Sequence, residues 1–223
     1  MNIVLLVPSR GRPARARAMY DSVLATAIED VDVRFLVDAD DPELEEYQAS
    51  GVPMTVMTER IGYTASLNLA ARLRWDDAEI LGAFGDDVLF RTVGWDLAVR
   101  EALREPGIAY GNDLVHAAGH PTAVWMSSSI AKALGWLALP YSWHLWVDDA
   151  WKALGAASGT LRYLPEVIVE HMHPAVGKAE LDDTYRSVYD GDRAHRDHIG
   201  FVGWRELDLE RDAGIVREVA EGA

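Results

Sequence analysis

Two adjacent carboxylates follow a short apolar stretch near the middle of the sequence. Asp86 and Asp87 come directly after residues 80–84, whose apolar character predicts a buried strand. Two acids at the end of such a strand are poorly placed unless a cation lies beside them. Carboxylate oxygens suit Mg²⁺ or Mn²⁺, ions that typically bridge a carboxylate and the phosphates of a nucleotide. The alternative is a simple turn in which Asp87 caps the next segment.

A second acid pair, Asp148 and Asp149, lies in the first turn of an expected helix over residues 147–156. A carboxylate within hydrogen-bond reach of a hydroxyl can accept its proton as a general base. The alternative is that both acids only stabilise the helix dipole. Aromatic side chains near the pair offer a stacking surface for a sugar or a base, or else belong to the core. They are Trp143, Trp146 and Trp151.

Two histidines, His171 and His173, follow an expected strand over residues 167–170. Residues two apart on a strand point to the same face, so one or both can bind a metal. A single histidine would more often be structural. The polar residues that follow either cover a phosphate as a mobile loop or form an ordinary surface loop. They are Gly177, Lys178, Asp182, Asp183 and Tyr185.

Two polar turns follow the first two expected strands. The turn Pro8, Ser9, Arg10, Gly11, Arg12 precedes a helix that starts at Pro13. Backbone N–H groups at a helix start bind anions, and arginines bind phosphate, although solvated arginines in an ordinary turn are equally compatible. The turn is not a P-loop, because the Gly-Lys-Ser/Thr ending is missing. The second turn carries Asp38, Asp40 and Asp41. It either accepts hydrogen bonds from a ribose and base or caps a helix that starts near Pro42.

These motifs require an α/β framework to bring them together. Strands are expected over residues 3–7, 33–37, 54–57 and 80–84, with helices over 13–27, 64–75 and 94–104. This alternation predicts a mostly parallel, doubly wound sheet, in which the turns after residues 7, 37 and 84 share one crevice. The second half predicts helices over 127–136 and 147–156 and strands over 161–163 and 167–170, followed by polar helical segments.

Composition limits the classes of protein to which this sequence can belong. The chain has 223 residues, 49% of them apolar, which is enough for one sizeable domain. The net charge of −15 disfavours a broad nucleic-acid backbone interface but not action on a base or a small substrate. There is no cysteine and no run of apolar residues long enough to span a membrane. The first apolar run is too short for a signal peptide, so we expect a cytoplasmic protein.

The order of these motifs resembles that of the GT-A glycosyltransferases, most closely the family-2-like inverting branch, with its short bacterial and phage versions. The resemblance spans residues 1–185. It implies an α/β, Rossmann-like GT-A fold with a mostly parallel central sheet flanked by helices and a smaller acceptor-side region. We therefore expect one domain with a nucleotide-sugar half (1–110), an acceptor half (111–190) and a helical tail (191–223), acting in a bacterial or phage-infected cytoplasm.

The resemblance also implies a role for each motif. Asp87, with His171 or His173, would hold Mn²⁺ or Mg²⁺, and Asp149, with Asp148 as the alternative, would be the base. Gly85 stands where the Asp-x-Asp motif has its first acid, and Asp148 stands where the family usually has Glu. The residues implied to hold the nucleotide-sugar are Pro8, Ser9, Arg10, Arg12, Asp38, Asp40, Arg60, Asn68, Asp86, Lys178 and Tyr185.

The implied reaction moves a sugar, in a single inverting displacement, from a nucleotide-sugar to a hydroxyl group. UDP is the commonest nucleotide in the resembled family. The acceptor hydroxyl could belong to a glycan, a small molecule, a protein or a modified nucleobase. Three alternatives stay open: a nucleotidyltransferase that makes the nucleotide-sugar, a metal hydrolase, and a non-catalytic nucleotide- or carbohydrate-binding module.

Overall fold

A computed structural model describes residues 1–180, 182–188 and 191–222 of the chain. Its first half alternates strands and helices as the sequence predicts. The elements are β1 (Ile3–Ser9), α1 (Pro13–Thr26), β2 (Val31–Asp38), α2 (Leu44–Ser50), β3 (Met54–Met57), α3 (Tyr63–Arg72), β4 (Ile80–Ala83), β5 (Val88–Phe90) and α4 (Trp95–Ala102). The three-residue strand β5 was not expected, because so short a run has no periodicity of its own.

The second half is less regular. Its elements are β6 (Ile108–Asn112), the 3-10 turn η1 (Ala117–Gly119), β7 (Val124–Ser127), α5 (Ser128–Leu134), α6 (Val147–Ser158), β8 (Leu161–His171), the 3-10 turn η2 (Pro174–Val176), α7 (Asp183–Val188), α8 (Gly191–Leu207) and α9 (Leu209–Glu221). Strands β6 and β7 were not predicted. None of the helices in the described part of the chain combines the length and apolar character needed to cross a membrane.

Eight strands form one curled sheet in the order β3-β2-β1-β4-β7-β6-β8-β5. The neighbours β3, β2, β1 and β4 pair in parallel, as expected for a doubly wound sheet. Antiparallel pairs begin where β7 joins β4 and continue from β7 to β6 and from β8 to β5. The sheet is therefore parallel in its first half and mixed in its second.

Strand β8 corrects the prediction of two separate strands over 161–163 and 167–170. It runs without a break beside β6, and the register slips where Gly111 pairs with Leu164 but Asn112 pairs with Ile168. The extra residues on β8 include Pro165, which cannot donate to a ladder and is tolerated at a bulge. In the sequence the proline indicates the end of a strand, whereas in the structure the strand continues past it with a local irregularity.

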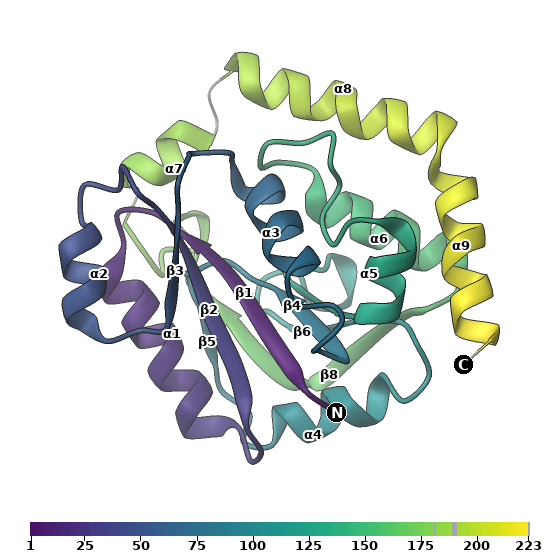
Figure 1. The fold of residues 1–223 in the computed structure, drawn as a ribbon, viewed down its shortest axis with the longest axis horizontal. Coiled ribbons are helices and arrows are strands. Elements are labelled where there is room, and N and C mark those ends of the chain that lie inside the picture. Colours follow the sequence, from purple (N-terminus) through teal and green to yellow (C-terminus); the bar gives the residue numbers. More distant parts are fainter. Residues whose placement is uncertain (181, 189–190, 223) are drawn as a thin grey trace.

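Helices cover both faces of the sheet (Figure 1). Alternate β1 residues point to opposite faces, as the strand period requires. Ile3 and Leu5 pack with residues of α1 and α4, whereas Val4 and Leu6 pack with residues of α3, α5, α6 and α9. Strand β1 lies between β2 and β4, so the chain reverses its direction of travel across the sheet there. Ligands of open α/β sheets bind outside the carboxyl ends of the strands at such a point.

Candidate active site

A cleft of about 690 Å³ opens at the carboxyl ends of β1 and β4. It brings together most of the residues that were predicted to bind or react. These are Pro8, Ser9, Arg10, Arg12, Asp38, Arg60, Asp86, Asp87, Asp148, Asp149, His171, His173 and Tyr185. Segments that are more than 170 residues apart along the chain therefore contribute to one concave site.

Three of the described residues predicted to bind the nucleotide-sugar lie outside the cleft lining. Asp40 is exposed and pairs with Arg10, with 2.6 Å between Oδ1 and Nη1. Lys178 pairs with Glu170 at 2.9 Å. Asn68 is buried, and its Oδ1 accepts the backbone N–H groups of Leu137 and Ala138 at 2.8 and 2.9 Å. The Asn68 amide thus joins α3 to the segment after α5, outside the cleft lining.

Asp86 anchors the turn after β1. Ser9 Oγ donates to its Oδ2 at 2.6 Å, and Arg12 Nη1 donates to its Oδ1 at 3.1 Å. Tyr47 completes the network, because its hydroxyl lies 2.6 Å from Ser9 Oγ and accepts the Arg12 N–H at 2.9 Å. Burial raises the pKa of Asp86 to about 6, against the opposing effect of Arg12. Asp86 therefore holds the turn in place through its own protein contacts.

Tyr47 lies on α2, and the sequence offered no reason to place it here. A lone tyrosine in a short helix indicates a core position, and its side chain is indeed fully buried. The hydrogen bonds of its hydroxyl depend on how α2 packs on α1, which no local pattern encodes.

Arg10 connects the ends of β1 and β2. Its Nη1 lies 3.1 Å from Asp38 Oδ2 and 2.6 Å from Asp40 Oδ1. Burial raises the pKa of Asp38, and the positive charges of Arg10 and Arg60 act in the opposite direction. The two turns that were expected to share a crevice are thus joined directly by ion pairs.

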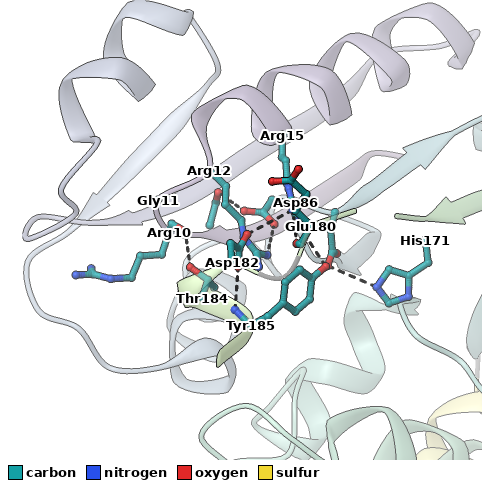
Figure 2. Close-up of polar contacts among 12 residues, drawn as sticks. Arg10, Gly11, Arg12, Arg15, Asp86, His171, Glu180, Asp182, Thr184 and Tyr185 are labelled. Atoms are coloured by element: carbon teal, nitrogen blue, oxygen red, sulfur yellow. Dashed lines mark hydrogen bonds and ion pairs between the residues drawn. The ribbon is translucent and has the colours of Figure 1, made fainter. Parts of the chain in front are cut away.

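Asp87 has a different environment from its neighbour Asp86. The Tyr185 hydroxyl donates to Asp87 Oδ2, and His171 Nε2 lies 3.5 Å from the same oxygen. Figure 2 shows the Tyr185 and His171 side chains pointing toward one another. Burial opposes ionisation of Asp87, but the bonds from His171 and Tyr185 outweigh it and hold its pKa well below the usual range. Asp87 is therefore the more acidic member of the pair.

Asp87 and His171 fit a divalent cation. Two donor atoms that each lie about 2.1 Å from one ion are at most about 4.2 Å apart, and the 3.5 Å between Asp87 Oδ2 and His171 Nε2 satisfies this limit. His173 is close by, with its ring 5.0 Å from that of His171. No cluster of three or more such ligands occurs in the described residues. A metal here would take its other ligands from phosphate and water, as Mg²⁺ sites in nucleotide enzymes do.

The segment around α7 lies against the turn after β1 (Figure 2). Asp182 accepts two hydrogen bonds from the Arg12 guanidinium, at 2.8 Å from Nε and 2.7 Å from Nη2. Thr184 Oγ1 donates to the Arg10 carbonyl at 3.0 Å, and the Tyr185 ring lies 4.2 Å from Arg12 Cζ. The sequence left open whether this segment covers a phosphate or is an ordinary surface loop, and the structure places it against Arg12.

Asp148 and Asp149 enter the cleft from the first turn of α6. The residue before this helix, Trp146, has a left-handed backbone with φ of 68°. A non-glycine residue in that region costs about 1 kcal/mol, so the surrounding packing must hold it there. Asp148 Oδ2 lies 3.6 Å from His120 Nε2. His120 was absent from the predicted site, because 28 residues separate it from Asp148 and no motif joins them.

The tryptophans flanking the acid pair fall into two groups. Trp143 and Trp146 line the cleft, so they are available for stacking. Trp151 is fully buried, and its Nε1 donates to the Leu137 carbonyl at 2.8 Å. The sequence allowed each tryptophan to be either a stacking surface or part of the core, and Trp151 belongs to the core.

Helix α8 positions the loop that carries Trp143. Buried Asp197 on α8 accepts the backbone N–H groups of Trp143, His144 and Leu145 at 2.7, 2.9 and 2.9 Å. On the other side of the loop Gly62 has φ of 90°, and a Cβ there would lie 2.6 Å from the Trp143 ring. Residues of α8 also line the cleft directly. The segment expected to be only a tail thus forms one wall of the site.

No protein-family profile and no curated protein sequence matches this chain. Solved structures do match it. A mannosyltransferase from Pyrobaculum calidifontis, in complex with GDP-Man and Mn²⁺, aligns with all of this chain and 75% of its own at 14% identity, with a TM-score of 0.61. Glucosyl-3-phosphoglycerate synthase from Mycobacterium tuberculosis, in complex with Mn²⁺, UDP-glucose and phosphoglyceric acid, aligns with 92% of this chain and 80% of its own at 11% identity, with a TM-score of 0.63.

A third similar structure is TarS from S. aureus. It aligns with 96% of this chain but only 45% of its own, at 12% identity and a TM-score of 0.60. Sequence identities this low establish a common architecture and leave the activity to be argued from the site. The mixed sheet, its flanking helices and these likenesses together show that the chain has the GT-A glycosyltransferase fold.

Proposed function

We propose that the protein is a glycosyltransferase that moves a sugar from a nucleotide-sugar to an acceptor hydroxyl. The observation that carries the proposal is one cleft with two chemically different groups of acids. Asp87 beside His171 fits a divalent cation, whereas Asp148 and Asp149 enter the same cleft from α6. The similar structures that contain GDP-Man or UDP-glucose together with Mn²⁺ support this assignment.

The donor would bind on the side of β1 and β4. Ser9, Arg10 and Arg12 from the first turn, with Asp38 and Arg60, would contact the nucleotide, and a UDP-sugar is the first donor to test. Tyr185 lies beside Asp87 and would be close to the diphosphate. Mn²⁺ or Mg²⁺ held by Asp87 and His171, with His173 as a further candidate, would stabilise the charge of the departing diphosphate.

The transfer would be a single displacement with inversion. A carboxylate of the Asp148–Asp149 pair takes the proton from the acceptor hydroxyl, and that oxygen forms a bond to the anomeric carbon. The bond from the anomeric carbon to the diphosphate oxygen breaks, and its electron pair leaves with the nucleoside diphosphate. Resemblance favours Asp149 as the base.

A panel of nucleotide-sugars in a thermal-shift experiment, with and without Mn²⁺, tests donor binding. We expect metal-dependent stabilisation by one donor, of about 2.7 kcal/mol at a concentration 100 times its Kd. Product analysis then distinguishes the reactions, because glycosyl transfer releases a nucleoside diphosphate and nucleotidyl transfer releases pyrophosphate. No stabilisation by any donor, or release of pyrophosphate, would contradict the proposal.

A variant of the acid pair and a matched control test whether transfer depends on the acids in the cleft. The double variant Asp148→Asn, Asp149→Asn should abolish transfer and keep the donor-dependent thermal shift. The control is Asp76→Asn, which changes an exposed acid paired with Lys132 on the surface. Normal transfer by the folded double variant would rule out both acids as the base.

A further inference from the structure

His120 is the residue that distinguishes the two acids at the start of α6. Its Nε2 lies 3.6 Å from Asp148 Oδ2, and its side chain is 25% exposed. Among the described residues, no side-chain hydrogen bond or ion pair involves the Asp149 carboxylate. Both carboxylates line the cleft, so the two acids differ in the side chain that each one contacts.

The loop between β6 and β7 holds His120 in place through contacts that do not involve the cleft. Asp113 Oδ1 accepts the backbone N–H groups of Val115, His116 and Ala117 at 2.9, 2.7 and 3.0 Å. Tyr110 OH donates to the Ala118 carbonyl at 2.8 Å. These bonds fix the loop from η1 onward, so the position of His120 is set by the fold.

A lysine on α6 ties the same loop to the helix that carries the acids. Lys152 Nζ donates to the Gly119 carbonyl at 2.7 Å, one residue before His120. Lys152 lies one helical turn after Asp148, so the anchor and the acid are on neighbouring positions of one helix face. The loop and the first turn of α6 therefore form one unit with the imidazole between them.

We propose that His120 is a positioning residue that holds the Asp148 carboxylate toward the cleft, and that Asp148 is consequently the proton acceptor of the pair. This inference rests on the proposed glycosyl transfer. In the step, the acceptor O–H bond breaks and its proton passes to Asp148, while His120 stays paired with the other side of that carboxylate. A histidine and a carboxylate that orient one another in this way are a common arrangement for a general base.

The charges around the pair support the assignment. Burial raises the pKa of Asp148, and His120 and His171 oppose this rise while Asp149 adds to it. The pKa of His120 is raised by Asp148 and Asp149 and lowered by burial and by Lys152. The His116 ring lies 5.6 Å from that of His120. A base works best when its pKa approaches the working pH, and Asp148 has moved in that direction.

Single variants of the two acids give the first test. Asp148→Asn should lower kcat by about 100-fold or more, because the proton acceptor is lost. Asp149→Asn should lower kcat by less than about tenfold. Both variants should keep the donor-dependent thermal shift. The reverse order of losses would overturn the assignment and leave the proposed glycosyl transfer intact.

The test of His120 uses His120→Gln, which keeps a hydrogen-bond donor and removes the positive charge. We expect a lower kcat at an unchanged donor KM, and an acid limb of the kcat profile that moves to higher pH by about one unit. The sign follows because the limb reports ionisation of Asp148, and loss of a neighbouring cation raises its pKa. A lost packing contact alone would not move this limb.

His116→Gln is the matched control. His116 lies on the same loop and also pairs with an acid, with 3.0 Å to Asp113, but that acid, unlike Asp148, does not line the cleft. Its variant should leave the acid limb in place. An unmoved limb in folded His120→Gln, or the same movement in both variants, would overturn the inference. Absence of transfer by the wild-type protein with every donor would overturn the proposed function as well, so the two failures are distinguishable.

Discussion

The two sides of the cleft are built in different ways: the proposed donor side at the ends of β1 and β4, and the proposed acceptor side formed by the 143–145 loop, the start of α6 and α8. On the donor side, side chains bond to one another: Arg12 donates to Asp86 and Asp182, and the Tyr185 hydroxyl donates to Asp87. On the acceptor side, buried carboxylates bond to backbone N–H groups, as Asp197 does for the loop carrying Trp143. Side-chain pairs can exchange partners when a ligand arrives, whereas a backbone cap fixes the shape of a loop. We therefore expect side chains on the donor side to change partners when a ligand binds, and the loop on the acceptor side to keep its conformation.

The largest expected effect lies on the donor side, at Asp87. We expect Asp87→Asn to lower kcat/KM by about a thousandfold, which corresponds to about 4 kcal/mol, because the cation site loses its charged ligand. The Mn²⁺-dependent part of the donor thermal shift should disappear together with the activity. A folded variant that keeps both would show that Asp87 does not bind the metal.

The next effect lies on the acceptor side, at Asp197. Asp197→Ala leaves three backbone N–H groups without their acceptor and should lower the free energy of unfolding by about 3 kcal/mol. Urea unfolding measures the loss, with Glu206→Ala on the exposed face of the same helix as control. If the two sides differ as described, the folded Asp197 variant still binds donor with wild-type affinity. A large loss of donor affinity would contradict that separation.

A smaller effect is expected at Asp182, which lies on the donor side. Asp182→Asn removes the charge that pairs with Arg12 and should lower the free energy of unfolding by about 1 kcal/mol, because Asp182 is 33% exposed and solvent screens the pair. Donor binding should become several-fold tighter, since Arg12 no longer has to leave a carboxylate. Calorimetric titration with a nucleoside diphosphate and Mn²⁺ measures this, and Asp183→Asn is the exposed neighbouring control. Weaker binding would mean that Asp182 holds Arg12 ready for the ligand.

The last effect, similar in size to that at Asp182, concerns acid stability on the acceptor side. Burial lowers the pKa of His144 to about 4, below the ordinary value of 6.5. Between these two values the unfolded chain binds the proton more readily, so stability falls as the pH decreases from 6.5 toward 4. We expect a contribution of about 1 to 2 kcal/mol to the loss. Urea midpoints at pH 7 and 4.5 should differ less in His144→Gln than in the wild type, and an equal difference would contradict this.

The sequence predicts the donor side well, because local patterns determine it. The apolar run before Asp86 and the helix start at Pro13 follow from neighbouring residues, and both elements form within a few residues of the predicted bounds. Parallel strands then bring Ser9 and Asp86 together without any further information. The structure places His171 beside Asp87, a pairing that the resemblance implied and the periodicity alone could not give.

The acceptor side depends on contacts between distant segments, and single-sequence patterns do not encode them. His120 and Asp197 each lie in a segment whose local pattern indicates only a loop or a helix, and the same holds for Tyr47 on the donor side. Asn68 shows the opposite case, because the resemblance implied a nucleotide contact and its side chain bonds to buried backbone groups. The bulge at Pro165 likewise needs β6 beside it before it can be distinguished from a strand end.

The capping of the 143–145 loop by Asp197 has a consequence for protein synthesis. A chain emerges from the ribosome with its N-terminal part first, and its folding can begin before the rest is made. The strands from β1 to β4 can pair while α8 is still being made, but the acceptor wall needs a carboxylate 54 residues further along the chain than Trp143. During translation, therefore, the central strands can assemble early, and the cleft wall formed by the 143–145 loop is completed last.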